Sequence, residues 1–129
     1  MSTKWRAIIL GLAALLAACS PHTLRVTEVQ IGRTLNADET VGITATTFGP
    51  TDTVYIAVLT SGIGSATIGV RWKFGDRLVN EASKQVSYKD RAATDFSLKG
   101  AAGFPTGDYT AEVSFDGKPV ETKAFRVLK

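Results

Sequence analysis

The sequence of 129 residues predicts an all-β domain, an antiparallel β-sandwich of about seven to nine short strands that begins near residue 24. Three observations carry this prediction. Apolar and polar residues alternate with a period of two along most of the chain. Turn residues such as Gly, Pro, Asn and Asp separate these runs at short intervals. After residue 19, no stretch has the 3.6-residue apolar period of a convincing helix.

The first predicted strand covers residues 24–31, and the parity of its apolar positions changes after Val26. Such a change within one strand predicts a β-bulge. A second strand is predicted over residues 41–45, where Val, Ile and Ala alternate with other residues. Residues 53–60 are apolar almost throughout and rich in β-branched side chains, which is typical of a central strand.

The clearest alternation follows a turn at residues 61–64. One face of this strand is apolar and the other is small or basic; the apolar positions are Ile68, Val70, Trp72 and Phe74. A tight turn at Gly75-Asp76 leads into short strands at residues 77–79 and 84–88. Residues 94–98 then alternate again.

Two further strands end the chain. Residues 109–115 alternate and run into Asp116-Gly117, the strongest hairpin signal in the sequence, because a two-residue type I′ turn needs positive φ at both positions. The last strand covers residues 120–127. A switch of parity between Ala124 and Phe125 predicts a second bulge there.

Residues 1–18 have the composition of an export signal. Lys4 and Arg6 make the first six residues positive, and residues 7–18 carry no charge. A membrane-spanning helix needs roughly 20 apolar residues, so this run is too short to span and fits a signal peptide. The run ends in Leu16-Ala17-Ala18-Cys19, which resembles the lipobox of bacterial lipoproteins. The competing interpretation is an ordinary secretory signal followed by an odd cysteine.

The lipobox resemblance implies a lipid on Cys19. A signal peptidase would recognise Leu16, Ala17 and Ala18, and Cys19 would become the first residue and carry a diacylglycerol, often with a third acyl chain on its amine. Two or three acyl chains give a stable membrane anchor. Ser20, in place of the Asp that retains such proteins at the inner membrane, implies the outer membrane facing the periplasm; the inner membrane and the cell surface are the alternatives. Residues 19–23 form a short tether and residues 24–129 the sandwich domain.

Composition bears on several other functions. Without residues 1–18 the chain has 13 basic and 12 acidic residues, so a basic nucleic-acid surface loses its main support. Cys19 is the only cysteine and His22 the only histidine, so neither a disulfide nor a His/Cys metal centre is expected. No cofactor is expected apart from the covalent lipid.

Two residues give the predicted sandwich a likeness to immunoglobulin and fibronectin III domains. Trp72 lies on the third main strand, where such folds often pack a tryptophan in the core. Tyr109 opens the next-to-last strand after a Pro-Thr-Gly-Asp turn, which is similar to the tyrosine corner of these folds. Ala111 stands where an antibody domain has its second cysteine, so the inter-sheet disulfide is not expected. The architecture alone assigns no function.

Candidate chemistry is sparse. The Gly62-Ile63-Gly64 turn is followed by no predicted helix that could bind a phosphate. Ser61 and Ser65 could act as nucleophiles only with a nearby base, and the only histidine of the chain lies in the tether. Five acids could in principle form a catalytic pair, but each lies in a turn or on a polar strand face; they are Asp90, Asp95, Asp108, Glu112 and Asp116.

A basic contact surface is the remaining candidate site. Arg71 and Lys73 share one strand face and Arg77 follows the next turn, so they could meet anionic lipid, cell-wall polymer or an acidic partner. The alternative is an ordinary solvated face.

We expect a non-catalytic, lipid-anchored envelope protein that acts as an interaction or assembly module for an unknown envelope protein or cell-wall component. The alternative is a carbohydrate- or small-ligand-binding module that uses the loops at residues 61–65 and 101–108. An enzyme is the third hypothesis.

Overall fold

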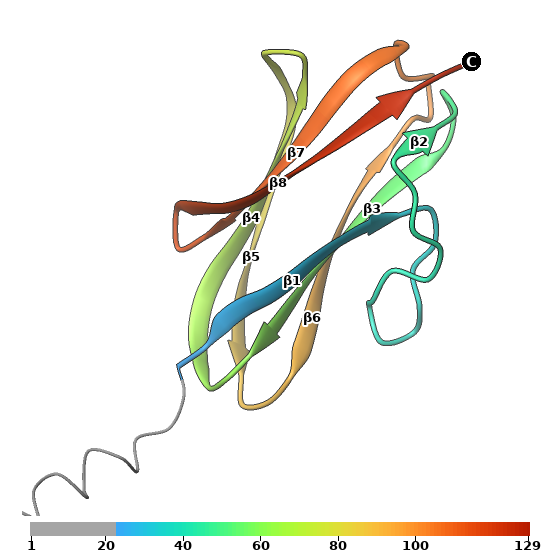
Figure 1. Ribbon diagram of the computed structural model, residues 1–129. Coiled ribbons are helices and arrows are strands. Elements are labelled where there is room, and N and C mark those ends of the chain that lie inside the picture. The colour runs from blue at the N-terminus through green and yellow to red at the C-terminus, as the bar shows by residue number, and fades with distance from the viewer. Residues whose placement is uncertain (1–22) are drawn as a thin grey trace, which may run out of the picture.

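The computed structural model describes residues 23–129, which form two β-sheets packed face to face (Figure 1). The predicted all-β sandwich is therefore confirmed. The predicted signal peptide, Cys19 and all of the tether except Thr23 lie outside the described residues. No helix within residues 23–129 is long and apolar enough to cross a membrane.

The smaller sheet has the strand order β1-β3-β6 and the larger sheet the order β2-β8-β7-β4-β5. All pairings are antiparallel except the short parallel contact of β2 with β8. The strands of the smaller sheet are β1 (Arg25–Gly32), β3 (Thr53–Ser61) and β6 (Ala92–Lys99). Those of the larger sheet are β2 (Thr47–Phe48), β4 (Gly64–Phe74), β5 (Arg77–Tyr88), β7 (Gly107–Phe115) and β8 (Lys118–Val127).

The neighbouring strands β4, β7 and β8 lie in the order of strands C, F and G of an immunoglobulin domain. Trp72 is on β4 and Tyr109 is near the start of β7. Both residues that carry the sequence resemblance therefore occupy the strands that the resemblance implies.

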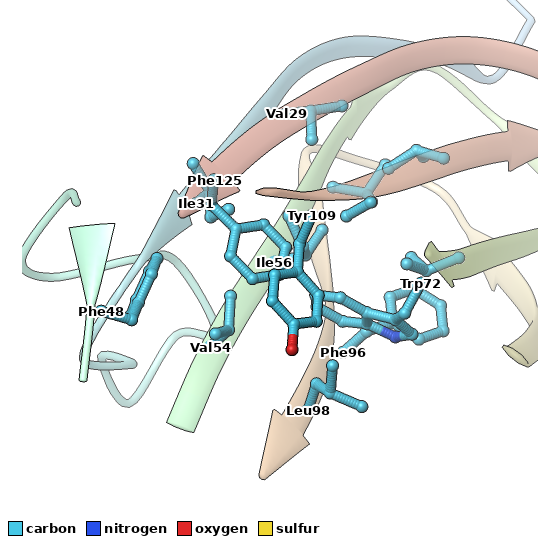
Figure 2. Close-up of a cluster of buried hydrophobic side chains, with 14 of the residues drawn as sticks. Val29, Ile31, Phe48, Val54, Ile56, Trp72, Phe96, Leu98, Tyr109 and Phe125 are labelled. Atoms are coloured by element: carbon cyan, nitrogen blue, oxygen red, sulfur yellow. The ribbon is translucent and has the colours of Figure 1, made fainter. Parts of the chain in front are cut away.

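The core fills the space between the sheets (Figure 2). On the central strand β3, Val54, Ile56 and Val58 are fully buried, which identifies the inward face that the apolar sequence did not reveal. Aromatic rings surround Phe125: their centroids lie 5.6, 6.2 and 5.2 Å from its ring and belong to Phe48, Trp72 and Tyr109 respectively. Such aromatic clusters contribute attraction beyond their buried area.

Two local predictions are confirmed by backbone geometry. The register of β1 against β3 shifts between Val26 and Glu28, where the parity change predicted a bulge. At the β7–β8 turn, Asp116 and Gly117 both have positive φ, at 50° and 82°. Asp116 Oδ1 also accepts a hydrogen bond from Thr67 N at 2.8 Å, so the turn is fixed to β4.

The predicted strand at residues 41–45 is wrong. The segment belongs to a loop that bends back onto the end of β1, where Arg33 N donates to Ile43 O and Gly42 N donates to Thr34 O. Its backbone groups are thus satisfied without a continuous ladder. Val41 is buried, whereas the side chain of Ile43 is 59% exposed.

Residues 77–79 and 84–88 are not separate strands. They belong to the single 12-residue strand β5, which lies at the edge of its sheet and is exposed along most of its length. Because neither face of β5 is covered over much of its length, its sequence need not alternate.

The predicted bulge at Ala124 is also misplaced. The β7–β8 register is continuous there and shifts between Val113 and Ser114, which leaves Val120 of β8 as the extra residue. Ala124 is exposed and faces outward, so the apparent parity switch next to Phe125 reflects an apolar side chain on the solvent face.

Candidate functional site

The tyrosine corner is present at the start of β7. The Tyr109 hydroxyl donates a hydrogen bond to Pro105 O at 2.6 Å, four residues upstream. The Tyr109 ring is buried and stacks on Phe125 on one side and Phe74 on the other. Burial raises the pKa of the Tyr109 hydroxyl above 10.0, and the positive charge of Arg77 opposes that shift.

Replacing Tyr109 with phenylalanine should lower the free energy of unfolding by about 1 kcal/mol, because the variant loses one partly buried hydrogen bond and keeps the ring. The wild-type stability should also fall more steeply than that of the variant above about pH 10, where the unfolded hydroxyl ionises before the folded one. Urea denaturation of both proteins at neutral and alkaline pH measures both effects. Equal stability at neutral pH would count against the hydrogen bond, and parallel pH profiles would contradict the raised pKa.

The structure divides the predicted basic surface. Arg71 and Lys73 share the outward face of β4, but Arg77 pairs with Phe74 on the opposite face of the sheet, with its guanidinium 5.9 Å from the Phe74 ring centroid. A register shift between Trp72 and Lys73 separates the two parts of the β4–β5 pairing. Arg71 forms an ion pair with Glu81 at 3.2 Å and also lies opposite Glu112 on β7. The charge of Arg71 is therefore balanced locally.

Four of the five candidate acids serve the fold. Asp108 pairs with Arg126 at 2.9 Å, Asp95 lies 3.6 Å from Lys84, and Asp116 fixes the β7–β8 turn. Asp90 Oδ1 accepts a hydrogen bond from Arg91 N at 3.0 Å. The fifth, Glu112, lies opposite Arg71. Within residues 23–129, no group of three or more His, Cys, Asp or Glu side chains could hold a metal ion.

A groove on the outer face of the smaller sheet brings together residues that the sequence did not connect. Its volume is about 630 Å³, and Arg25 of β1, Ser61 of β3 and Arg91 beside β6 contribute to its lining. Glu28 and Asp38 also line it. The hydroxyl and N–H of Thr40 lower the pKa of the Asp38 carboxyl by hydrogen bonding to it.

The groove lies at the end of the sandwich where the chain enters it. Thr23 forms a bridge with Ile63, and Leu24 N donates to Ile63 O at 3.1 Å. The proximity of Arg25 and Arg91 was not predicted, because it depends on how the strands pair. Arg25 lies opposite Ser61 on β3, and the neighbouring Thr60 lies opposite Ala92, the residue after Arg91. Only the unusual density of turn residues around Ser61 could have drawn attention to this end.

Comparison with known proteins identifies the fold and no more. No protein-family model matches the chain, and no characterised protein matches it by sequence. Among solved structures, it is similar to part of a β-glucosidase from Erythrobacter marinus, with a TM-score of 0.56 and 8% identity over 82% of this chain and 15% of that one. A β-glucosidase from Listeria innocua in complex with glucose gives a TM-score of 0.54 and 11% identity over 84% of this chain and 16% of that one.

The C-terminal domain of Wzt is similar over more of its own length. The TM-score is 0.55 and the identity 12%, over 85% of this chain and 77% of that domain. The chain thus spans less than a fifth of the two β-glucosidases and most of the Wzt domain. At these identities the likeness establishes a shared sandwich architecture.

Proposed function

We propose that this protein is a lipid-anchored component of the bacterial cell envelope, held through Cys19 at the periplasmic face of the outer membrane, and that it acts by binding. The sandwich serves as a non-catalytic interaction or assembly module. Its partner is a protein or cell-wall component of the same compartment.

The observation that carries this proposal is where the sandwich begins. Leu24 is already buried and hydrogen-bonded to the β3–β4 turn. Cys19 is four residues before Thr23, a distance of at most roughly 14 Å along an extended chain. A lipid on Cys19 would therefore hold one particular end of the sandwich close to the bilayer.

The opposite end is then available for a partner. The first described residues and the C-terminus lie at opposite ends of the sandwich, and the β4–β5 turn lies at the C-terminal end (Figure 1). There Leu78 and Val79 are 43% and 41% exposed at the start of the edge strand β5. Exposed apolar residues on an edge strand are a typical starting point for strand pairing with another chain.

Separation of inner and outer membranes by density tests this proposal. We expect the protein in the outer-membrane fraction and, in intact cells, protection from protease added outside. Recovery in the soluble periplasm would contradict the anchor. Recovery with the inner membrane would contradict the proposed membrane, and digestion in intact cells would contradict the proposed periplasmic face. Either result would leave the anchor standing.

A carbohydrate or other small polar ligand is the second candidate partner. The groove near Ser61 favours it, because Arg25, Arg91, Glu28 and several hydroxyl groups converge on one hollow. Purified sandwich domain without Cys19, screened against glycans and cell-wall fragments, distinguishes the two. Saturable binding that is lost in an Arg91→Ala variant would favour the ligand-binding function.

A further inference from the structure

The turn that joins β3 to β4 presents an apolar tip beside the point where the chain enters the sandwich. Ile63 is 52% exposed, although its backbone is fixed by the hydrogen bond from Leu24 and the bridge to Thr23. Gly62 has a φ of 101°, and a Cβ there would collide with the Thr23 carbonyl. The turn is therefore packed tightly against the entering chain, with the Ile63 side chain left in solvent.

Three basic residues surround this tip. Arg25 lies opposite Ser61, at the end of β3. Lys89 comes directly after Tyr88, and Tyr88 pairs with Gly64 at the start of β4. Arg91 comes directly before Ala92, and Ala92 pairs with Thr60 near the end of β3. All three basic side chains are exposed. None of the four ion pairs found within residues 23–129 involves them.

The acidic side chains near this end bind groups other than the three basic side chains. Asp90 accepts the Arg91 N–H, and Asp38 accepts hydrogen bonds from Thr40. Glu28 accepts a hydrogen bond from Gln30 Nε2 at 3.0 Å. Glu121, which lines a hollow with Arg25, forms an ion pair with Lys123 at 3.3 Å. The end as a whole thus presents an exposed isoleucine among three cations whose charges are not neutralised by ion pairs.

We infer that this end of the sandwich, composed of Arg25, Ile63, Lys89 and Arg91, rests on an anionic lipid surface. Ile63 inserts among the headgroups, and the three cations contact lipid phosphates. Apolar side chains that enter the interface together with basic residues bind anionic bilayers in this way. The inference rests on the proposed anchor, because the short span from Cys19 keeps this end near the bilayer and makes its contacts effectively intramolecular.

Two single-cysteine variants test this contact. In the lipidated protein the Cys19 sulfur is a thioether, so Ile63→Cys gives one reactive thiol for an environment-sensitive fluorophore. Leu78→Cys is the matched control, since the exposed fraction of Leu78 is similar to that of Ile63. Leu78 also lies far from the tip: it pairs with Lys73, which is nine residues, or roughly 30 Å, along β4 from Gly64. Both labelled proteins are purified from membranes and reconstituted in phosphatidylethanolamine–phosphatidylglycerol vesicles that contain a nitroxide lipid.

We expect the fluorophore at position 63 to lose roughly half or more of its emission, since interfacial groups enter the bilayer by about 5–10 Å. The fluorophore at position 78 should lose little. Adding Arg25→Gln and Arg91→Gln, or replacing phosphatidylglycerol with phosphatidylcholine, should reduce the quenching at position 63.

Equal quenching at the two positions, in protein that stays on the vesicles, would overturn the inference and leave the anchor standing. Protein that leaves the vesicles would overturn both. Quenching at position 63 that is unchanged by both charge tests would overturn the assignment to anionic lipid.

Discussion

Replacing Trp72 with alanine should lower the free energy of unfolding by about 3–5 kcal/mol. The indole is 1% exposed and packs edge-on against Phe125, with 6.2 Å between ring centroids. Its removal exposes a cavity between the sheets that the surrounding strands cannot close completely. Urea denaturation at neutral pH measures the change from the shift in the unfolding midpoint.

Arg71→Ala is the matched control for this substitution. Arg71 precedes Trp72 on the same strand and faces solvent, and its ion pair with Glu81 is exposed. Its loss should cost less than about 1 kcal/mol. Similar losses in the two variants would contradict the alternation of β4 between core and solvent.

The strands β4, β6 and β7 could be predicted because the side chains on one face of each are buried and most of those on the other face reach solvent. On β6 and β7 the burial alternates residue by residue, and on β4 it does so around Trp72 but not at Gly69, which is buried between Ile68 and Val70. The tyrosine corner was predictable as well, since Tyr109 follows a turn at a fixed distance and its hydroxyl has an acceptor within that turn.

The errors arise where local pattern and tertiary environment differ. Residues 41–45 alternate like a strand, but their backbone bonds are made with the irregular end of β1. The strand β5 is a free edge, so burial does not shape its sequence over the exposed part. The bulge at Val120 leaves no parity signal, because both sides of β8 are exposed at that point.

The candidate sites were harder to predict than the fold. Arg71, Lys73 and Arg77 are close in sequence, but the turn at Gly75-Asp76 places Arg77 opposite Phe74, on the other face of the sheet from Arg71 and Lys73. Arg25 and Arg91 are far apart in sequence and line one groove. Which distant residues line one groove depends on the order of the strands in the sheet, and the alternation of apolar and polar residues in the sequence does not determine that order.

Replacing Cys19 with alanine should abolish incorporation of labelled fatty acid and either release the protein from the membrane or leave its signal peptide uncleaved. Cys19 is the only cysteine in the sequence, so no other thiol can accept the diacylglycerol. Loss of two or three acyl chains removes the anchor, since a single weak contact does not hold a protein stably at a bilayer. Metabolic labelling followed by membrane fractionation measures both effects.

Ser20→Asp is the matched control for Cys19→Ala. It changes the neighbouring residue that is expected to influence sorting and keeps Cys19, the residue that we propose is lipidated. The fatty-acid label should therefore persist, with the protein shifted toward the inner membrane. Label that persists in the Cys19→Ala variant would contradict the lipobox assignment.

Mass spectrometry of the N-terminal peptide from membrane-derived protein is the most direct test of the anchor. The proposal predicts a peptide that starts at Cys19 and carries the added mass of a diacylglycerol, with or without a third acyl chain on the amine. A peptide that starts elsewhere, or an unmodified Cys19, would contradict it.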